Sequence, residues 1–139
     1  MDFAHTPDAV RSVLENARTR TSGRLITVIG CGGDRDKGKR KEIGKIASNL
    51  SDFVWVTSDN PRGEDPMEII QQMLSDITKS NYAVAVDRKE AIIDAIRSAK
   101  YQDIVLLLGK GNESTQEING RFLPFSDRDI AKEVIRGLV

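Results

Sequence analysis

Three short polar stretches carry the residue types that could do chemistry, and each follows an apolar run: residues 30–41, 58–66 and 109–113. The charged or strongly hydrogen-bonding side chains that they could bring together are Arg35, Asp59, Asn60, Arg62 and Glu113. Fixed cations beside fixed anions suit a zwitterion, such as an amino acid, better than a polyphosphate. We therefore expect an amino-acid site if the three stretches meet.

The second stretch holds its arginine on a stiff backbone. Pro61 fixes its own φ and biases Asn60 toward extended geometry. Arg62 is a planar, permanently charged group, which suits the binding of a carboxylate or a phosphate. A simpler interpretation pairs Arg62 with a neighbouring carboxylate in a solvated turn. The candidates for that pairing are Asp59, Glu64 and Asp65.

Two nucleotide-binding signatures are nearly present in the first stretch, and both are incomplete. Residues 30–35 begin like the dinucleotide fingerprint, but Arg35 stands in place of the last glycine. Residues 33–39 have the spacing of a phosphate-binding loop, but Arg40 replaces the hydroxyl residue that would hold magnesium. The glycines are more simply explained by a sharp turn from strand to helix, which disfavours an autonomous nucleotide triphosphatase.

Composition excludes several other classes of function. Lys and Arg together number 21, as do Asp and Glu, so no net charge recruits nucleic acid or an anionic membrane. No apolar run approaches the roughly 20 residues that span a bilayer. Cys31 is the single cysteine, which rules out an internal disulfide, and with His5 it makes only a weak candidate for a thiol nucleophile and base. We expect a cytoplasmic protein without a metal site of its own.

Apolar runs and helical apolar spacing alternate along the whole chain. Expected strands cover residues 25–29, 53–57, 82–86 and 104–108. Expected helices begin near Pro7, before Ile43, at Pro66, after Asp87 and after Ser126, the third of them extending to Ile77. Asn119-Gly120 between two short runs is typical of a type I′ hairpin.

Such alternation predicts one doubly wound α/β domain over residues 1–139: a mainly parallel, Rossmann-like sheet with helices on both faces and a short C-terminal β-hairpin. Residues 104–108 are the most apolar run and are expected to form the central strand. The carboxyl ends of parallel strands meet at one edge of the sheet, where ligands bind in such folds. The three polar stretches are therefore expected to share a cleft.

Four motifs, in order and spacing, resemble the C-terminal domain of the Mur ligases, specifically of the members that add diaminopimelate. They are residues 2–8 (Asp-Phe-Ala-His-Thr-Pro-Asp), 30–40, 59–62 (Asp-Asn-Pro-Arg) and 109–113 (Gly-Lys-Gly-Asn-Glu). The Asp-Asn-Pro-Arg signature marks enzymes that add meso-diaminopimelate rather than lysine. Phe3 stands where the family usually has tyrosine, and Asn112 where it has histidine.

The resemblance implies a binding role for particular residues. Those that would hold diaminopimelate are Arg35, Asp59, Asn60, Pro61, Arg62, Gly109 and Glu113. Arg62 and Asn60 would bind the distal carboxylate, and Arg35 another carboxylate. The Gly109 carbonyl and Glu113 would bind the distal ammonium. Asp2 would lie near the ribose of ATP.

The resemblance also implies the reaction. ATP and Mg²⁺ would activate the D-glutamate carboxylate of UDP-N-acetylmuramoyl-L-alanyl-D-glutamate, and the amine of diaminopimelate would attack it. The phosphate loop and UDP-sugar domain precede this domain in the family, and Met1 abuts the middle of a family motif at residues 2–8. We therefore expect an excised domain that is inactive alone. The alternatives are a related ligase that adds lysine or glutamate, a stand-alone amino-acid-binding module, or a structural interaction domain.

Overall fold

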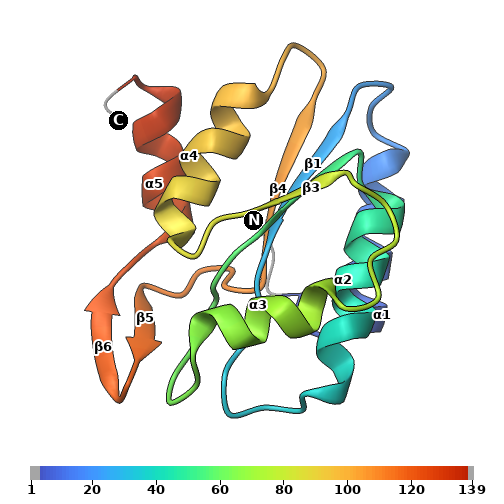
Figure 1. Ribbon diagram of the computed structural model, residues 1–139. Helices are drawn as coiled ribbons and strands as arrows, with labels where there is room; N and C mark the ends of the chain where they lie inside the picture. Colours follow the sequence, from blue (N-terminus) through green and yellow to red (C-terminus); the bar gives the residue numbers. More distant parts are fainter. Residues whose placement is uncertain (1–3, 138–139) are drawn as a thin grey trace.

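A computed structural model describes residues 4–137 as three layers, with a parallel sheet between two groups of helices (Figure 1). The strands are β1 (Leu25–Ile29), β2 (Phe53–Val56), β3 (Tyr82–Val84) and β4 (Ile104–Leu108). They are parallel and lie in the order β3-β2-β1-β4. The doubly wound α/β prediction is confirmed.

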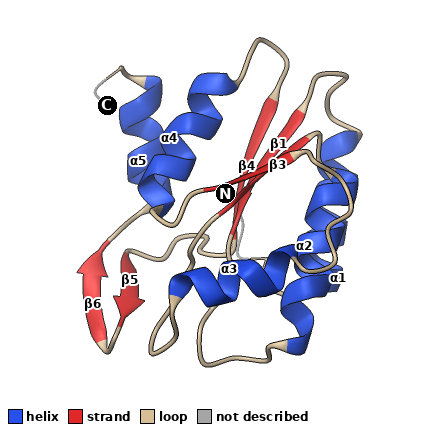
Figure 2. Cartoon of the chain, viewed as in Figure 1, coloured by secondary structure: helices blue, strands red, loops and turns tan. Residues whose placement is uncertain are grey.

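The helices divide between the two faces of the sheet (Figure 2). They are α1 (Pro7–Arg18), α2 (Gly38–Leu50), α3 (Pro66–Leu74), α4 (Arg88–Ser98) and α5 (Asp127–Ile135). Helices α1, α2 and α3 pack on one face and bury Leu14, Ile43 and Met73, whereas α4 and α5 bury Ile92 and Ile130 on the other. Successive residues of a strand point to opposite faces of the sheet. Because helices cover both faces, apolar residues are favoured on both of them, and each strand is therefore a nearly continuous apolar run.

Side-chain caps explain where four of these helices begin. Thr6, Asp65, Asp87 and Ser126 each accept a hydrogen bond from a backbone N–H of the first turn. Pro7 and Pro66 follow directly, at positions where the missing N–H costs nothing. The predicted starts are therefore confirmed, although α3 ends at Leu74 rather than at Ile77.

The expectation of a central strand at residues 104–108 is wrong. Within residues 4–137, β4 pairs only with β1 and lies at an edge of the sheet, while β1 and β2 are central. Leu106 packs toward one helical layer and Leu107 toward the other. Coverage of both faces, not a central position, therefore accounts for the apolar sequence of β4.

The predicted hairpin is present as β5 (Thr115–Ile118) and β6 (Arg121–Pro124). Asn119 has φ of 50° and Gly120 has φ of 77°, as a type I′ turn requires. The hairpin also pairs with the chain at Arg62, whose N–H donates to the Glu117 carbonyl at 2.9 Å and whose carbonyl accepts from Asn119 N–H at 2.8 Å. This pairing ties the hairpin to the loop after β2.

No described helix combines the length and the apolar character needed to cross a membrane.

Gly44 allows α2 and α3 to approach closely, and we expect Gly44→Ala to destabilise the protein. A Cβ at this position would lie 1.9 Å from the Met73 carbonyl oxygen. Replacing glycine by alanine inside a helix normally stabilises it by about 1 kcal/mol. Here the overlap should reverse the sign, with a loss of about 1–3 kcal/mol in the free energy of unfolding measured by urea titration.

Gly38 provides the matched control, because a Cβ there would come no closer than 3.4 Å to Asp36 Oδ1. Gly38→Ala should leave the free energy of unfolding unchanged or raise it. Equal stability of the wild type and Gly44→Ala would contradict this account of the α2–α3 contact.

Candidate functional site

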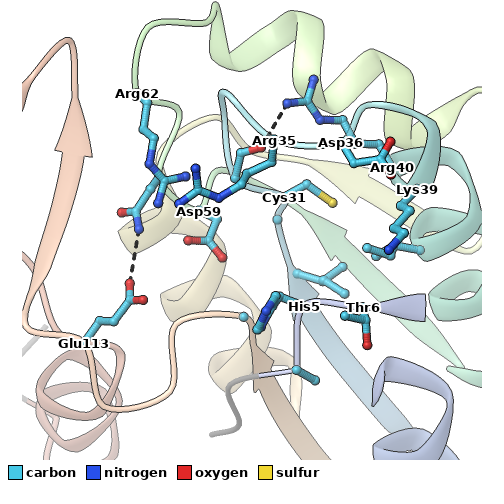
Figure 3. Close-up of a pocket in the computed structure, with 17 residues that line it drawn as sticks. His5, Thr6, Cys31, Arg35, Asp36, Lys39, Arg40, Asp59, Arg62 and Glu113 are labelled. Carbon is cyan, nitrogen blue, oxygen red and sulfur yellow. Dashed lines mark hydrogen bonds between the residues drawn. The ribbon is translucent and has the colours of Figure 1, made fainter. Parts of the chain in front are cut away.

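A cavity of about 390 Å³ lies at the carboxyl edge of the sheet, between the loops that follow β1, β2 and β4 (Figure 3). Its lining includes six of the seven predicted diaminopimelate-binding residues: Arg35, Asp59, Asn60, Arg62, Gly109 and Glu113. Pro61 is buried and is not part of this lining. Its carbonyl packs against Gly33, where a Cβ would lie 1.8 Å from the Pro61 oxygen. The three polar stretches therefore meet, as topology predicted.

Arg62 is held from two sides at the cavity. Its backbone has a φ of 54°, and its guanidinium donates from Nε to Glu117 Oε1 at 3.2 Å and from Nη1 to the Gly33 carbonyl at 3.0 Å. Pairing with Asp59, Glu64 or Asp65 does not occur, so the simpler interpretation of Arg62 is wrong. Within residues 4–137, Nη2 makes no hydrogen bond, which leaves its hydrogens for a ligand.

Arg35 approaches Arg62 on the same side of the cavity. A Cβ on Gly32 would lie 2.8 Å from Arg62 Nη1 and 3.6 Å from Arg35 Cγ. Arg35 is exposed and donates only a long hydrogen bond, 3.3 Å, to the Asp34 carbonyl within the described part of the chain. Two guanidinium groups thus face one cavity, a pattern that fits a ligand with more than one carboxylate.

Two carboxylates, those of Asp59 and Glu113, also line the cavity (Figure 3). Asp59 is buried, and burial raises the pKa of its carboxyl group, while Arg88 and Lys110 act in the opposite direction. Gly109 has a φ of 110°, and a Cβ there would lie 2.5 Å from Asp59 Oδ2. Only glycine fits this position, which brings the backbone of the β4 loop against Asp59.

A buried ion pair between Arg88 and Asp127, which the sequence did not reveal, fixes the loops after β2 and β4 relative to each other. Arg88 and Asp127 have fully buried side chains, and their bidentate contact measures 2.8 Å and 2.6 Å. Arg88 also donates to the carbonyls of Ser58 and Leu108, each at 3.1 Å. It therefore connects the carboxyl ends of β2 and β4 to the start of α5. Nothing in the local sequence distinguishes Arg88 from a solvated helix residue.

A second ion pair connects the loops after β1 and β2. Arg40 donates to both oxygens of Glu64, at 3.0 Å and 2.6 Å, and Arg40 Nη2 also donates to the Gly32 carbonyl at 2.9 Å. The hydrogen bond from Arg40 is the main cause that lowers the pKa of Glu64 from its ordinary value of 4.5 to about 2. Glu64 thus anchors the polar loop that carries Asp34 and Arg35.

This pKa predicts a pH dependence of stability. Because the pKa of Glu64 is lowered on folding, its contribution is present above about pH 4.5 and is lost as the pH falls toward about 2. The difference in unfolding free energy between the wild type and Glu64→Gln should be constant above about pH 5 and shrink toward pH 2. Chemical denaturation across this range measures it. Glu68→Gln, at an exposed position of α3, should show no such trend.

The structure does not support Cys31 as a thiol nucleophile with His5 as its base. Cys31 is buried beside the cavity, and burial with the nearby Asp59 carboxylate raises the pKa of its thiol to about 12. The thiol is therefore protonated at neutral pH, although His5 also lines the cavity. Among the described residues, no group of three His, Cys, Asp or Glu side chains could hold a metal ion. Asp2 and Phe3 lie outside the described residues.

A sequence model of the family described as "Mur ligase, glutamate ligase domain" matches residues 1–111. The chain belongs to the Mur ligase family. A UDP-N-acetylmuramoyl-L-alanyl-D-glutamate–2,6-diaminopimelate ligase of Syntrophomonas wolfei is 48% identical over 142 residues, and the ligase of the same name from Aquifex aeolicus is 49% identical over 138. These alignments cover 100% and 99% of this chain and 29% of each relative.

Solved structures agree with this membership. A structure of a UDP-N-acetylmuramoyl-L-alanyl-D-glutamate–2,6-diaminopimelate ligase superposes with a TM-score of 0.93 at 42% identity, covering 97% of this chain and 28% of that one. Escherichia coli FolC in complex with ADP superposes with a TM-score of 0.60 at 21% identity over 99% of this chain and 28% of its own, which shows a shared fold alone. The chain therefore spans under a third of the length of these Mur ligase relatives.

Proposed function

We propose that this chain is the C-terminal domain of an ATP-dependent ligase of peptidoglycan synthesis, and that it holds meso-diaminopimelate for addition to UDP-N-acetylmuramoyl-L-alanyl-D-glutamate. The observation that carries the proposal is that Arg35, Arg62, Asp59 and Glu113 line the same cavity. Relatives named for this reaction, at 48% and 49% identity, add support.

The charged groups of diaminopimelate complement the hydrogen-bond donors and acceptors that line the cavity. Arg62 Nη2 and Asn60 Nδ2 would donate to the distal carboxylate, and the exposed guanidinium of Arg35 to the other carboxylate. Glu113 and the Gly109 carbonyl would accept from the distal ammonium. With both ends held, the second amine is left for attack, so the domain contributes positioning and charge stabilisation.

ATP, Mg²⁺ and the UDP-linked dipeptide belong to the proposed whole ligase. The described residues gather no metal-binding group, so we assign Mg²⁺ to no residue among them. ATP would supply the activation of the glutamate carboxylate, and Asp2 remains the proposed contact to its ribose. We accordingly propose that the 139-residue chain alone does not catalyse ligation. A cytoplasmic location is part of the proposal, in keeping with a buried free thiol at Cys31.

Calorimetric titration of the chain with meso-diaminopimelate, L-lysine and D-glutamate tests the proposal. Diaminopimelate should bind at least about tenfold more tightly than lysine, because lysine lacks the second carboxylate for Arg62. Equal or tighter binding of lysine or glutamate would favour a related ligase instead, and no binding of diaminopimelate at millimolar concentration would overturn the proposal. A parent reading frame without an upstream Gly-Lys-Thr phosphate loop would favour a stand-alone amino-acid-binding module.

A further inference from the structure

Lys110 is completely buried, with an exposed fraction of 0%, although lysine is among the residue types most rarely found inside proteins. It follows Gly109 in the loop after β4. Its ammonium donates to Asn60 Oδ1 at 2.9 Å, to Glu113 Oε1 at 3.0 Å and to the Thr115 carbonyl at 2.7 Å. An ammonium has three hydrogens, so these acceptors use all of them. Lys110 therefore has no hydrogen left for a ligand.

The contact with Lys110 determines which end of the Asn60 amide faces the cavity. Asn60 Oδ1 accepts from Lys110 Nζ at 2.9 Å and from Glu117 N–H at 3.0 Å. Both partners can only donate, which fixes Oδ1 on their side and Nδ2 on the other. Nδ2 donates one hydrogen to Glu113 Oε1 at 3.2 Å, the contact whose dashed line ends on Glu113 in Figure 3. Its second hydrogen has no partner within residues 4–137.

The same ammonium gives the two oxygens of the Glu113 carboxylate different roles. Oε1 accepts from Lys110 and from Asn60, whereas Oε2 makes no hydrogen bond to any described residue. One carboxylate oxygen is thus committed to the protein, and the other is left for a cation in the cavity.

We propose that Lys110 is a positioning residue that presents Asn60 as a hydrogen-bond donor and Glu113 as an acceptor to a zwitterionic ligand. This inference rests on the proposed function and names a residue through which its selectivity is set. Without the ammonium, Asn60 Oδ1 keeps only the Glu117 N–H as a donor, so the amide is held less strongly and turns its oxygen toward the ligand carboxylate more often, which is repulsive. Glu113 would also lose the partner that fixes its orientation.

The first test needs no ligand and follows the side-chain amide of Asn60 by ¹⁵N NMR. Lys110→Met keeps an unbranched stem of similar length and removes the donor. The Asn60 Nδ2 hydrogens should exchange with water at least about tenfold faster than in the wild type, because their orientation is no longer fixed. Lys89→Met, at an exposed position of α4, should leave them unchanged. An unchanged exchange rate of the Asn60 Nδ2 hydrogens in Lys110→Met would overturn the positioning role.

The second test measures the affinity for meso-diaminopimelate and separates geometry from charge. We expect Lys110→Met to lower the affinity about tenfold in the wild-type background. In the Asn60→Ala background the same substitution should lower it less than about threefold, because the effects of residues that act through each other are not additive. Lys110→Arg keeps the charge, but a planar guanidinium cannot place one nitrogen against all three acceptors. It should therefore also lose about tenfold. If Lys110→Met does not fold, Lys110→Arg carries both measurements.

The outcomes distinguish this inference from the proposed function. Binding by the wild type, together with equal binding by either Lys110 variant, would overturn the role of Lys110 and leave the proposed function standing. Full additivity of Lys110→Met with Asn60→Ala would likewise overturn it. Failure of the wild type to bind meso-diaminopimelate would overturn the proposed function itself.

Discussion

Arg62→Ala is expected to weaken the binding of meso-diaminopimelate by about 30- to 100-fold and to leave the binding of L-lysine within about twofold. The guanidinium is already oriented by Glu117 and Gly33, so its free Nη2 can bind a carboxylate without further ordering. A charge-assisted bond of this kind is worth about 2–3 kcal/mol. Lysine has no distal carboxylate and should be insensitive. Isothermal titration calorimetry with each ligand gives the ratio of the wild-type affinity to that of Arg62→Ala.

Arg121→Ala is the matched control for Arg62→Ala, because Arg121 is an exposed arginine on the same hairpin that contacts Arg62. It should bind both ligands as the wild type does. An equal loss for lysine and diaminopimelate in Arg62→Ala would contradict the carboxylate role and would point instead to a general disturbance of the cavity.

Arg88→Met is expected to lower the free energy of unfolding by about 3–5 kcal/mol, the largest loss of stability that we predict. The substitution leaves the Asp127 carboxylate buried and uncompensated, and it removes the donors to the carbonyls of Ser58 and Leu108. Urea denaturation followed by circular dichroism measures the loss. Because Arg88 joins the ends of β2 and β4, affinity for meso-diaminopimelate should fall in the variant wherever it remains folded.

The control is Arg11→Ala, which removes an exposed ion pair with Glu15 whose atoms lie 3.9 Å apart. Such pairs contribute about 0–1 kcal/mol, so stability should hardly change. Similar stabilities for Arg88→Met and Arg11→Ala would show that the buried pair is not what connects the strand ends.

Local sequence was enough to predict the layers, because each layer follows from local physics. Apolar spacing identified the strands, side-chain oxygens and prolines marked helix starts, and Asn119-Gly120 specified the hairpin turn. Parallel topology then placed three loops at one edge, which brought Arg35, Arg62 and Glu113 around one cavity. None of these steps required knowledge of long-range partners.

Long-range partners are where prediction from sequence failed. Arg62 pairs with Glu117, which lies 55 residues away, rather than with a neighbouring acid. Lys110 and Arg88 look like solvated charges in the sequence and are buried because distant loops supply their acceptors. The sequence did not reveal the edge position of β4 for a related reason. An apolar strand sequence indicates that helices cover both faces of the strand, but it does not indicate how many strands pair with it.

A crystal structure of the chain with meso-diaminopimelate tests the central claim most directly. We predict one ligand in the cavity, with its distal carboxylate within hydrogen-bonding distance of Arg62 and Asn60, its other carboxylate at Arg35 and its distal ammonium at Glu113. A ligand bound elsewhere, or bound in the cavity with its distal carboxylate turned away from Arg62, would contradict the account.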